Sequence, residues 1–322
     1  MGELTNFPWK KSRKMKKIKE IKKSTLFKII ISVLLIFFLF KRVGVGNITS
    51  TLRFFNIYFL LLAALAFFAN HLVAVVNLKI LSSPIKNIRW SELTKDYFHS
   101  YALGMLSPGK VGEFSLTYFL KNRGITFGEG AAIVLFDKLI TLLTLALIAL
   151  FGFGTFFPEV GKQSILIVLA AITLFFLFVV FSSNIRIFIR KFILRKYSFY
   201  FKGFSNYFKL MITSKSYLSI LNICLTLLKW VFSSLILYFI LIGFNVKIPF
   251  YQIYFISSFI ALVSLVPIAI NGIGVKESVA IFLYGVIGVP SNVILSSYIL
   301  SYVVQYSIVF IIFNLVGGKK EK

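Results

Sequence analysis

LSPGKVGE, residues 106–113, is a polar stretch with two glycines inside a chain that is otherwise mostly apolar. Pro108 removes a backbone hydrogen-bond donor, and Gly109 and Gly112 loosen the chain. Lys110 and Glu113 lie close together in the sequence, and both would be costly to expose to lipid. The stretch therefore cannot form an ordinary transmembrane helix.

A second stretch, residues 267–277, repeats these residue types late in the chain. It is PIAINGIGVKE, with a proline, two glycines and an adjacent lysine and glutamate. Broken segments at matching positions in the two halves of a chain are typical of substrate sites in membrane transporters. The candidate site residues of the two stretches are Ser107, Pro108, Gly109, Lys110, Gly112 and Glu113, and Asn271, Gly272, Gly274, Lys276 and Glu277.

The composition indicates a polytopic membrane protein. Of the 322 residues, 58% are hydrophobic and 17% aromatic, and the mean hydropathy is +0.90, which lies far outside the soluble average. The net charge of +26 fits nucleic acid, an anionic membrane surface, or orientation by cytoplasmic lysines. One cysteine and two histidines leave no disulfide framework and no clustered zinc or haem signature, so we expect neither metal nor cofactor.

Six hydrophobic runs are predicted as full spans, for which roughly 20 residues suffice. They are residues 26–40, 54–81, 130–153, 164–182, 217–243 and 293–316. A basic tail, residues 1–25, precedes the first run, which we interpret as an uncleaved signal anchor because no small-x-small cleavage site follows it. Residues 185–215 lie between two predicted spans and carry interleaved basic and aromatic side chains. This pattern favours helices in the headgroup region over nucleic-acid binding.

Residues 96–120 and 250–289 contain the polar stretches and are predicted as re-entrant hairpins. Each arm of the first is too short to cross, and its polar turn needs protein or water around it. The predicted fold class is thus an all-α polytopic membrane protein with six full spans and two re-entrant hairpins. Eight spans are the alternative, because the two arms of residues 250–289 are nearly long enough to cross.

The distribution of charge orients the chain. Of the 36 Lys and Arg residues, 25 lie in the tail, the C-terminus and links assigned to one side, and five lie in the opposite links. This asymmetry predicts that both termini are cytoplasmic in a multi-pass plasma-membrane protein. Residues 26–322 then form one transmembrane domain with two repeats of opposite topology, about residues 54–154 and 217–316, which favours a substrate site at the membrane midplane.

The charged residues of the two stretches suit an anionic headgroup. Lys110 and Lys276, together with free N–H groups at a helix start, would favour a phosphate or carboxylate. Two interpretations of Glu113 and Glu277 stay open. They are either helix caps or structural ion-pair partners, with Lys110 or Lys276 as the expected partner of Glu113, or they are protonated or paired with the substrate during transport.

Other polar residues lie within the predicted spans. Asp137 and Lys138 near the start of a span are either site residues or an interfacial pair whose lysine extends to the headgroups. Lys229 is expected to reach the membrane surface and has no assigned role. Three residues recur on one face of the 54–81 span and are expected to hydrogen-bond neighbouring helices: Asn70, His71 and Asn77.

At these residues the chain resembles the flippase-like membrane-domain family that includes the transmembrane region of lysylphosphatidylglycerol synthase. Residues 106–113, 137–139 and 271–277 are similar to the family's P-G-(R/K)-x-G-E, D-(K/R)-x and G-G-x-G-x-(R/K)-E patterns. Asn271 stands where the last pattern has glycine. The resemblance spans nearly the whole chain and implies handling of charged or polyprenyl-linked lipids by flipping. The soluble aminoacyl-transfer domain has no counterpart here, so we expect no lipid aminoacylation.

Three functions are compatible with the sequence. The leading one is a lipid translocase, with anionic or polyprenyl-linked membrane lipids as partners and no nucleic acid. The second is a membrane enzyme acting on a lipid phosphate, for which Ser107 could be a nucleophile, although neither polar stretch contains an arginine. The third is a non-catalytic membrane subunit of a larger assembly.

Overall fold

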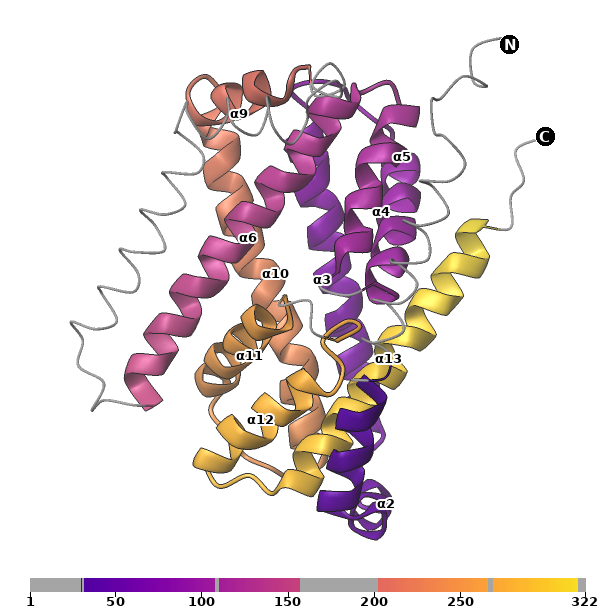
Figure 1. Ribbon diagram of the computed structural model, residues 1–322, viewed down its shortest axis with the longest axis vertical. Helices are drawn as coiled ribbons and strands as arrows, with labels where there is room; N and C mark the ends of the chain where they lie inside the picture. The colour runs from indigo at the N-terminus through magenta and orange to yellow at the C-terminus, as the bar shows by residue number, and fades with distance from the viewer. Residues whose placement is uncertain (1–29, 31, 108–109, 157–201, 266–268, 318–322) are drawn as a thin grey trace, which may run out of the picture.

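The computed structural model describes residues 30, 32–107, 110–156, 202–265 and 269–317, and within these ranges the secondary structure is helical without β-strands. This confirms the predicted all-α class. The elements shown in Figure 1 are α2 (Val45–Arg53), α3 (Tyr58–Ser82), α4 (Trp90–Met105), the short 3-10 helix η1 (Val111–Ser115), α5 (Leu116–Asn122), α6 (Phe127–Phe156), α9 (Phe204–Ile212), α10 (Ser216–Gly243), α11 (Phe250–Ser264), α12 (Val275–Val286) and α13 (Ser291–Gly317).

Four of these helices are long and apolar enough to cross a membrane. They are α3, residues 127–152 of α6, α10 and residues 291–312 of α13, and they coincide with four of the predicted spans. The helix Ser32–Val43 covers part of the predicted first span and bends by 75° into α2, which makes a fifth span if the bent pair counts as one. The predicted span at residues 164–182 lies outside the described residues. The chain is a multi-pass membrane protein.

The broken segments occupy opposite halves of the molecule. Figure 1 shows α4 and α5 in its upper half and α11 and α12 in its lower half, while α3, α6 and α10 run through both. The helices of each broken segment have 16 and 7 residues and 15 and 12 residues, fewer than the roughly 20 that a span needs. α3 packs against α10, α6 against α11, and α13 against α12 and α4.

Local sequence explains where α6 begins. Thr126 precedes the helix and Glu129 lies three residues later, in the arrangement of a capping box. The Glu129 carboxylate accepts from the Thr126 N–H at 3.1 Å, and the Glu129 N–H donates to the Thr126 hydroxyl at 3.4 Å. These two contacts satisfy backbone donors that the first helical turn leaves without partners.

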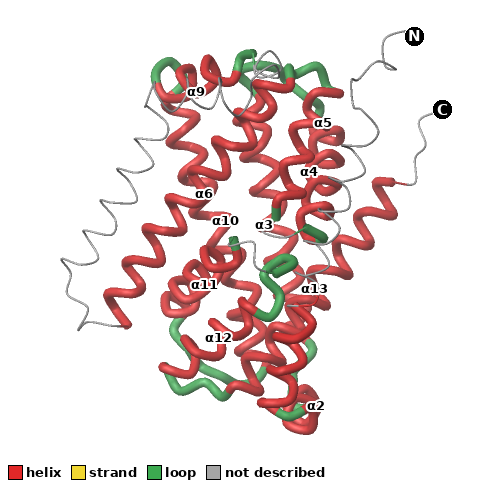
Figure 2. The backbone as a smooth tube through the Cα atoms, viewed as in Figure 1, coloured by secondary structure: helices red, strands yellow, loops and turns green. Residues whose placement is uncertain are grey.

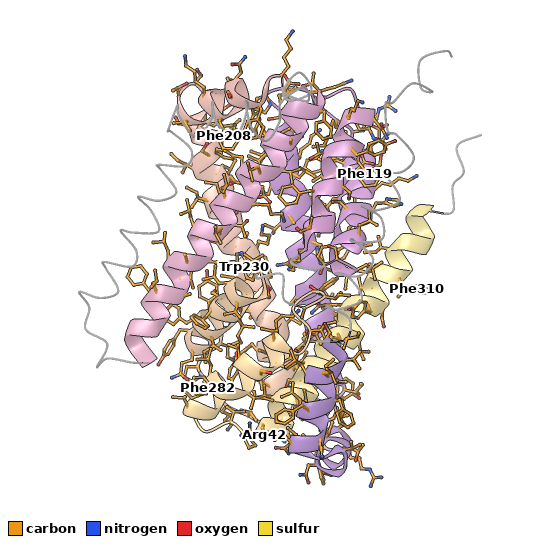
Figure 3. All side chains as sticks on the ribbon, viewed as in Figure 1. Arg42, Phe119, Phe208, Trp230, Phe282 and Phe310 are labelled. Atoms are coloured by element: carbon orange, nitrogen blue, oxygen red, sulfur yellow. The ribbon has the colours of Figure 1, made fainter. Side chains whose placement is uncertain are left out.

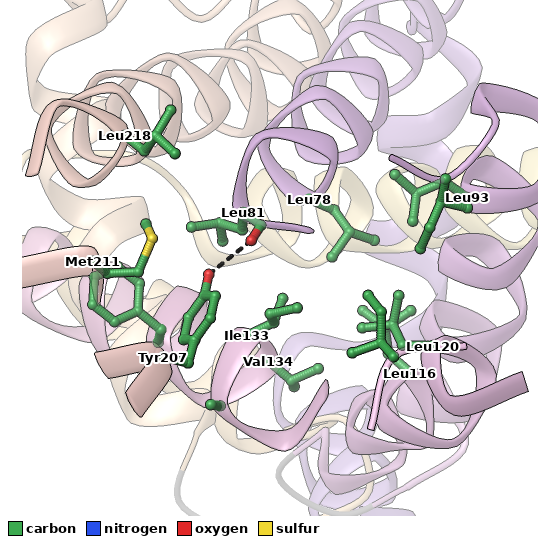
Figure 4. Packing of buried hydrophobic residues seen from close by; sticks show 14 residues of the cluster. Leu78, Leu81, Leu93, Leu116, Leu120, Ile133, Val134, Tyr207, Met211 and Leu218 are labelled. Carbon is green, nitrogen blue, oxygen red and sulfur yellow. Dashed lines mark hydrogen bonds between the residues drawn. The ribbon is translucent and has the colours of Figure 1, made fainter. Parts of the chain in front are cut away.

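One apolar cluster of buried residues lies at the upper end, where α9 packs against α6 and α10. Leu81, Ile133 and Met211 are buried there, as Figure 4 shows. The Tyr207 hydroxyl donates to the Leu81 carbonyl at 2.9 Å. Burial raises the pKa of Tyr207 far above its usual value, so the phenol remains a hydrogen-bond donor. Of the predicted interfacial stretch 185–215, only residues 202–215 are described.

Candidate functional site

The two broken segments meet at mid-height of the molecule. We define the first break as residues 106–110, between α4 and η1, and the second break as residues 265–274, between α11 and α12. The Asn271 N–H of the second break donates to the Ser107 carbonyl of the first at 3.4 Å. Figure 2 shows most loops at the two ends of the molecule and a further group at mid-height. The predicted site residues Pro108 and Gly109 lie outside the described residues, as does Pro267.

The first break turns sharply through Lys110. This residue has a left-handed backbone (φ 57°) and precedes η1, and a non-glycine residue seldom adopts that conformation. Gly112 is required by close approach, because a Cβ there would lie 2.1 Å from the Leu103 carbonyl oxygen. The Ser107 hydroxyl accepts from the Gly112 N–H at 2.6 Å and donates to the Gly104 carbonyl at 3.0 Å. Ser107 and Gly112 are therefore closely packed against the end of α4.

The second break has three positions with unusual backbone geometry within four residues. Asn271, Gly272 and Gly274 have φ of 49°, 69° and 86°, which glycine adopts freely and asparagine tolerates. The helix Ser32–Val43, which we call the N-terminal helix, also contacts this break. The Ile270 N–H donates to the Ser32 hydroxyl at 3.1 Å, so a backbone donor that would be costly to leave unpaired in a membrane has a partner.

Glu113 forms an ion pair with Lys138 of α6. The structure thus gives Glu113 a different partner from the expected Lys110 or Lys276, and Lys138 is turned toward the first break instead of extending to the headgroups. The Glu113 side chain is 14% exposed and that of Lys138 is 38% exposed. The Glu113 carbonyl also accepts from the Ser100 hydroxyl of α4 at 2.6 Å.

Asp137 belongs to an amide network that joins three long helices. The Asn77 side chain of α3 donates to the Asp137 carboxylate at 2.9 Å. Asn222 of α10 donates to the Asn77 side-chain oxygen at 2.7 Å and lies 3.4 Å from Asp137.

The other polar residues of α3 also bond to neighbouring helices. The Asn70 side chain donates to the Lys229 carbonyl at 2.5 Å, and His71 Nδ1 lies 2.8 Å from the Tyr97 hydroxyl. Asn70, His71 and Asn77 therefore all hydrogen-bond to neighbouring helices, which confirms the prediction.

Glu277 caps α12. Its carboxylate accepts from the Gly274 N–H at 2.5 Å and from the Tyr302 hydroxyl of α13. The residue is only 2% exposed. The Lys276 ammonium lies over the Tyr302 ring, 5.2 Å from its centroid, at the distance of a cation–π contact.

Three lysines around the breaks have no carboxylate within 4.0 Å among the described residues. They are Lys110, Lys229 and Lys276. Lys229 was missed by the sequence prediction. It lies at the middle of the 28-residue α10, roughly 20 Å from either end of the helix, so its side chain cannot reach the membrane surface. The neighbouring Trp230 lies at mid-height in Figure 3.

The surroundings of Lys229 tie it to the first half of the molecule. Its ammonium lies 3.4 Å from the Thr141 hydroxyl of α6 and within electrostatic reach of Asp137, Glu113 and Lys110. The position of this lysine within its apolar run was the signal that could have identified it. Within the described residues, no group of three His, Cys, Asp or Glu side chains is placed to hold a metal ion.

Comparison with known families gives one match. The family model described as the lysylphosphatidylglycerol synthase TM region matches residues 25–312. This range contains both breaks, the described helices from α2 to α12, and α13 up to residue 312. No curated protein matches the chain.

Proposed function

The chain belongs to the lysylphosphatidylglycerol synthase TM region family, and from this premise we propose that it is a translocase that moves a charged or polyprenyl-linked lipid headgroup between leaflets. The observation that carries the proposal is the position of Lys110, Lys229 and Lys276, which lie where the two breaks meet and have no carboxylate within 4.0 Å among the described residues. Unpaired charge inside a membrane domain is costly, and it is kept where it serves a substrate.

The carboxylates of the region are already engaged. Glu113 pairs with Lys138, Asp137 accepts from Asn77, and Glu277 accepts from the α12 backbone. The groups left to bind a substrate are therefore cationic. Lysine ammonium groups suit a phosphate, and the headgroup of a membrane lipid brings one to this depth while its acyl chains stay in the bilayer.

We also propose that the two halves are inverted repeats, and the contacts of two glutamates support this. Glu113 binds Lys138, 25 residues further along the chain and on the long helix that follows the first broken segment. Glu277 binds Tyr302, also 25 residues further along and on the long helix that follows the second broken segment. Equal spacing in sequence and equal placement in space are expected of repeats.

The breaks themselves match in the same register. Lys110 and Gly274 each lie three residues before the glutamate, each has a positive φ, and each precedes a helix. Ser107 and Asn271 each lie six residues before the glutamate, and they hydrogen-bond to each other. Equivalent residues touch each other next to a twofold axis, so this contact supports an axis through the meeting point of the breaks.

The phosphatase alternative has weaker support. The Ser107 hydroxyl binds the Gly112 N–H and the Gly104 carbonyl, so it is engaged in holding the first break. A serine nucleophile needs an adjacent base, and both hydrogen-bond partners of this hydroxyl among the described residues are backbone groups. We therefore propose transport without covalent chemistry.

The orientation follows from charge. We propose that the upper end in Figure 1, which carries α9 with its exposed Lys209, faces the cytoplasm, and that the chain lies in the plasma membrane with both termini cytoplasmic. Arg42 lies at the opposite, lower end in Figure 3.

Reconstitution of the full chain into vesicles tests the proposal. Fluorescent lipids with a panel of headgroups, polyprenyl phosphate included, are placed in both leaflets, and a membrane-impermeant quencher reports how fast the inner pool reaches the outer leaflet. We expect faster exchange than in protein-free vesicles for at least one anionic lipid. Lys229→Met should slow it about tenfold, whereas Lys209→Met on the exposed face of α9 should not. Exchange at the protein-free rate for every lipid would refute the proposal.

A further inference from the structure

We infer that one face of α10 lines a water-filled passage from the meeting point of the breaks to the upper end of the molecule, and that the described conformation holds this passage closed. The inference rests on the proposed translocase function. We define the α10 polar face by four residues, Asn222, Thr226, Trp230 and Ser234. Each has a buried side-chain atom without a hydrogen-bond partner among the described residues: Oδ1, Oγ1, Nε1 and Oγ, respectively.

The four positions form a row along the helix. They are spaced four residues apart, which places neighbouring members on the same side of an α-helix, and the row extends over roughly 18 Å of α10. Lys229 lies within this row, three residues after Thr226. Within the described part of the chain, no other helix carries more than one buried side-chain polar atom without a partner. The unsatisfied groups are therefore concentrated on α10.

Buried hydroxyl groups in other helices bind to their own backbone. Thr144 of α6, Ser258 of α11 and Ser297 of α13 each donate to the carbonyl four residues earlier, at 2.8 Å. This local bond is available to a hydroxyl in any helix. Thr226 and Ser234 are 0% exposed and lack it. Their hydroxyls are therefore turned away from the α10 backbone.

The α10 polar face is costly in the described conformation. A buried polar group without a partner destabilises a protein, and more so in a membrane domain, where lipid offers no partner. Native proteins keep few such groups. In a second conformation, in which this face borders water, each of the four atoms gains a partner. A transporter needs such a conformation, because its site opens to each side of the membrane in turn.

The passage leads toward the upper end, because the polar residues extend in that direction. Asn222 lies in the second turn of α10 (Ser216–Gly243), and Asn77 and Asp137 meet it there. In the opposite direction, beyond Ser234, the buried side chains of α10 are aliphatic: Ile236, Leu237, Ile240 and Leu241.

Two layers close the passage at the upper end. The first is the amide network of Asn77, Asp137 and Asn222, which joins α3, α6 and α10. The second is the apolar cluster that contains Tyr207 and Met211 of α9 (Figure 4). Asn77 bonds to both other members of the network, so its amide links the three helices. Opening the passage requires this link to break.

Cysteine accessibility tests for the passage. A thiol in apolar surroundings is inert, because the thiolate is the reactive form. Cys224 is replaced by alanine, and Thr226→Cys or Ser234→Cys is introduced into the full chain in vesicles, with a membrane-impermeant methanethiosulfonate as the probe. We expect both variants to react about tenfold faster than Thr144→Cys and Ser258→Cys, a difference of about 1.4 kcal/mol in the free energy of access.

Further variants test the direction and the closing network. Lys209→Cys, on the exposed face of α9, reacts when the upper end faces the reagent, and Lys247→Cys, in the exposed link after α10, reacts when the lower end does. Thr226→Cys should react together with Lys209→Cys. Adding Asn77→Ala should speed the reaction of Thr226→Cys by about tenfold and leave that of Thr144→Cys unchanged.

The outcomes separate this inference from the proposed function. The inference is overturned if Thr226→Cys and Ser234→Cys react no faster than Thr144→Cys and Ser258→Cys, or if they react only when the lower end faces the reagent. Lipid exchange by the same chain would then still support the translocase.

If the two α10 variants react rapidly but no lipid exchanges faster than in protein-free vesicles, the passage stands and the translocase function fails. General loosening of the fold has a different signature. Asn77→Ala would then speed the reaction of Thr144→Cys as much as that of Thr226→Cys, and the closing role of the amide network would be overturned. Thermal unfolding of each variant identifies misfolded protein.

Discussion

Replacing Lys138 by methionine should destabilise the protein through Glu113. The substitution keeps a long unbranched side chain and removes the ammonium that pairs with the Glu113 carboxylate. Breaking a fully buried ion pair by removing one partner costs about 3–5 kcal/mol. Since Glu113 is 14% exposed but Lys138 is 38% exposed, we take the lower end of that range, about 3 kcal/mol.

The double variant Glu113→Gln with Lys138→Met should recover most of this loss. It leaves two neutral groups in place of the ion pair, and such replacements are often close to neutral in stability. We therefore expect a coupling free energy of about 2 kcal/mol between the two positions. Thermal unfolding of the purified chain in detergent, followed by the fluorescence of its three tryptophans, measures the effect. At about 2 °C per kcal/mol, Lys138→Met should lower Tm by about 6 °C.

The control for this cycle is Lys209→Met, which removes an exposed lysine of α9 and should leave Tm within about 1 °C, since surface substitutions seldom exceed 0.5 kcal/mol. The reasoning is refuted if the double variant loses as much as the two single variants added together, because additivity means that the two side chains do not interact. It is equally refuted if Lys138→Met unfolds at the wild-type temperature.

Three further substitutions test the packing around the site, each by the same unfolding measurement. Gly112→Ala places a Cβ 2.1 Å from a backbone carbonyl of α4 and should lower Tm and slow lipid exchange, whereas Gly46→Ala, with nothing within 4 Å, should do neither. Asn222→Ala removes the donor to Asn77 and should cost about 1–3 kcal/mol. Tyr207→Phe loses one buried hydrogen bond and should cost about 1 kcal/mol.

The long helices could be predicted from the sequence because lipid imposes a simple rule on them. A continuous apolar run of the right length has few alternatives to a helix in a bilayer. The run at residues 217–243 became α10, Ser216–Gly243, with its ends shifted by a single residue at most. α6 extends three residues before its predicted start, because hydropathy does not register the Thr126 and Glu129 cap.

The pairings within the site could not be predicted in the same way. Polar residues in an apolar chain identified both breaks, but Glu113 and Lys138 are 25 residues apart, and their meeting depends on how α4 and η1 pack against α6. Lys229 was missed because a hydropathy average over a long apolar run absorbs one charge. Its distance from both ends of the run was available from the sequence and would have excluded an interfacial position.

The two halves of the proposed repeat differ in charge at equivalent positions. In the first half, the positions three before and 25 after the glutamate are both lysines, Lys110 and Lys138. In the second half, they are Gly274 and Tyr302. A side chain at position 274 is excluded, because its Cβ would lie 2.5 Å from Leu35 of the N-terminal helix. Packing of the helix Ser32–Val43 therefore excludes a lysine from position 274, whereas the equivalent position 110 in the first break accommodates one.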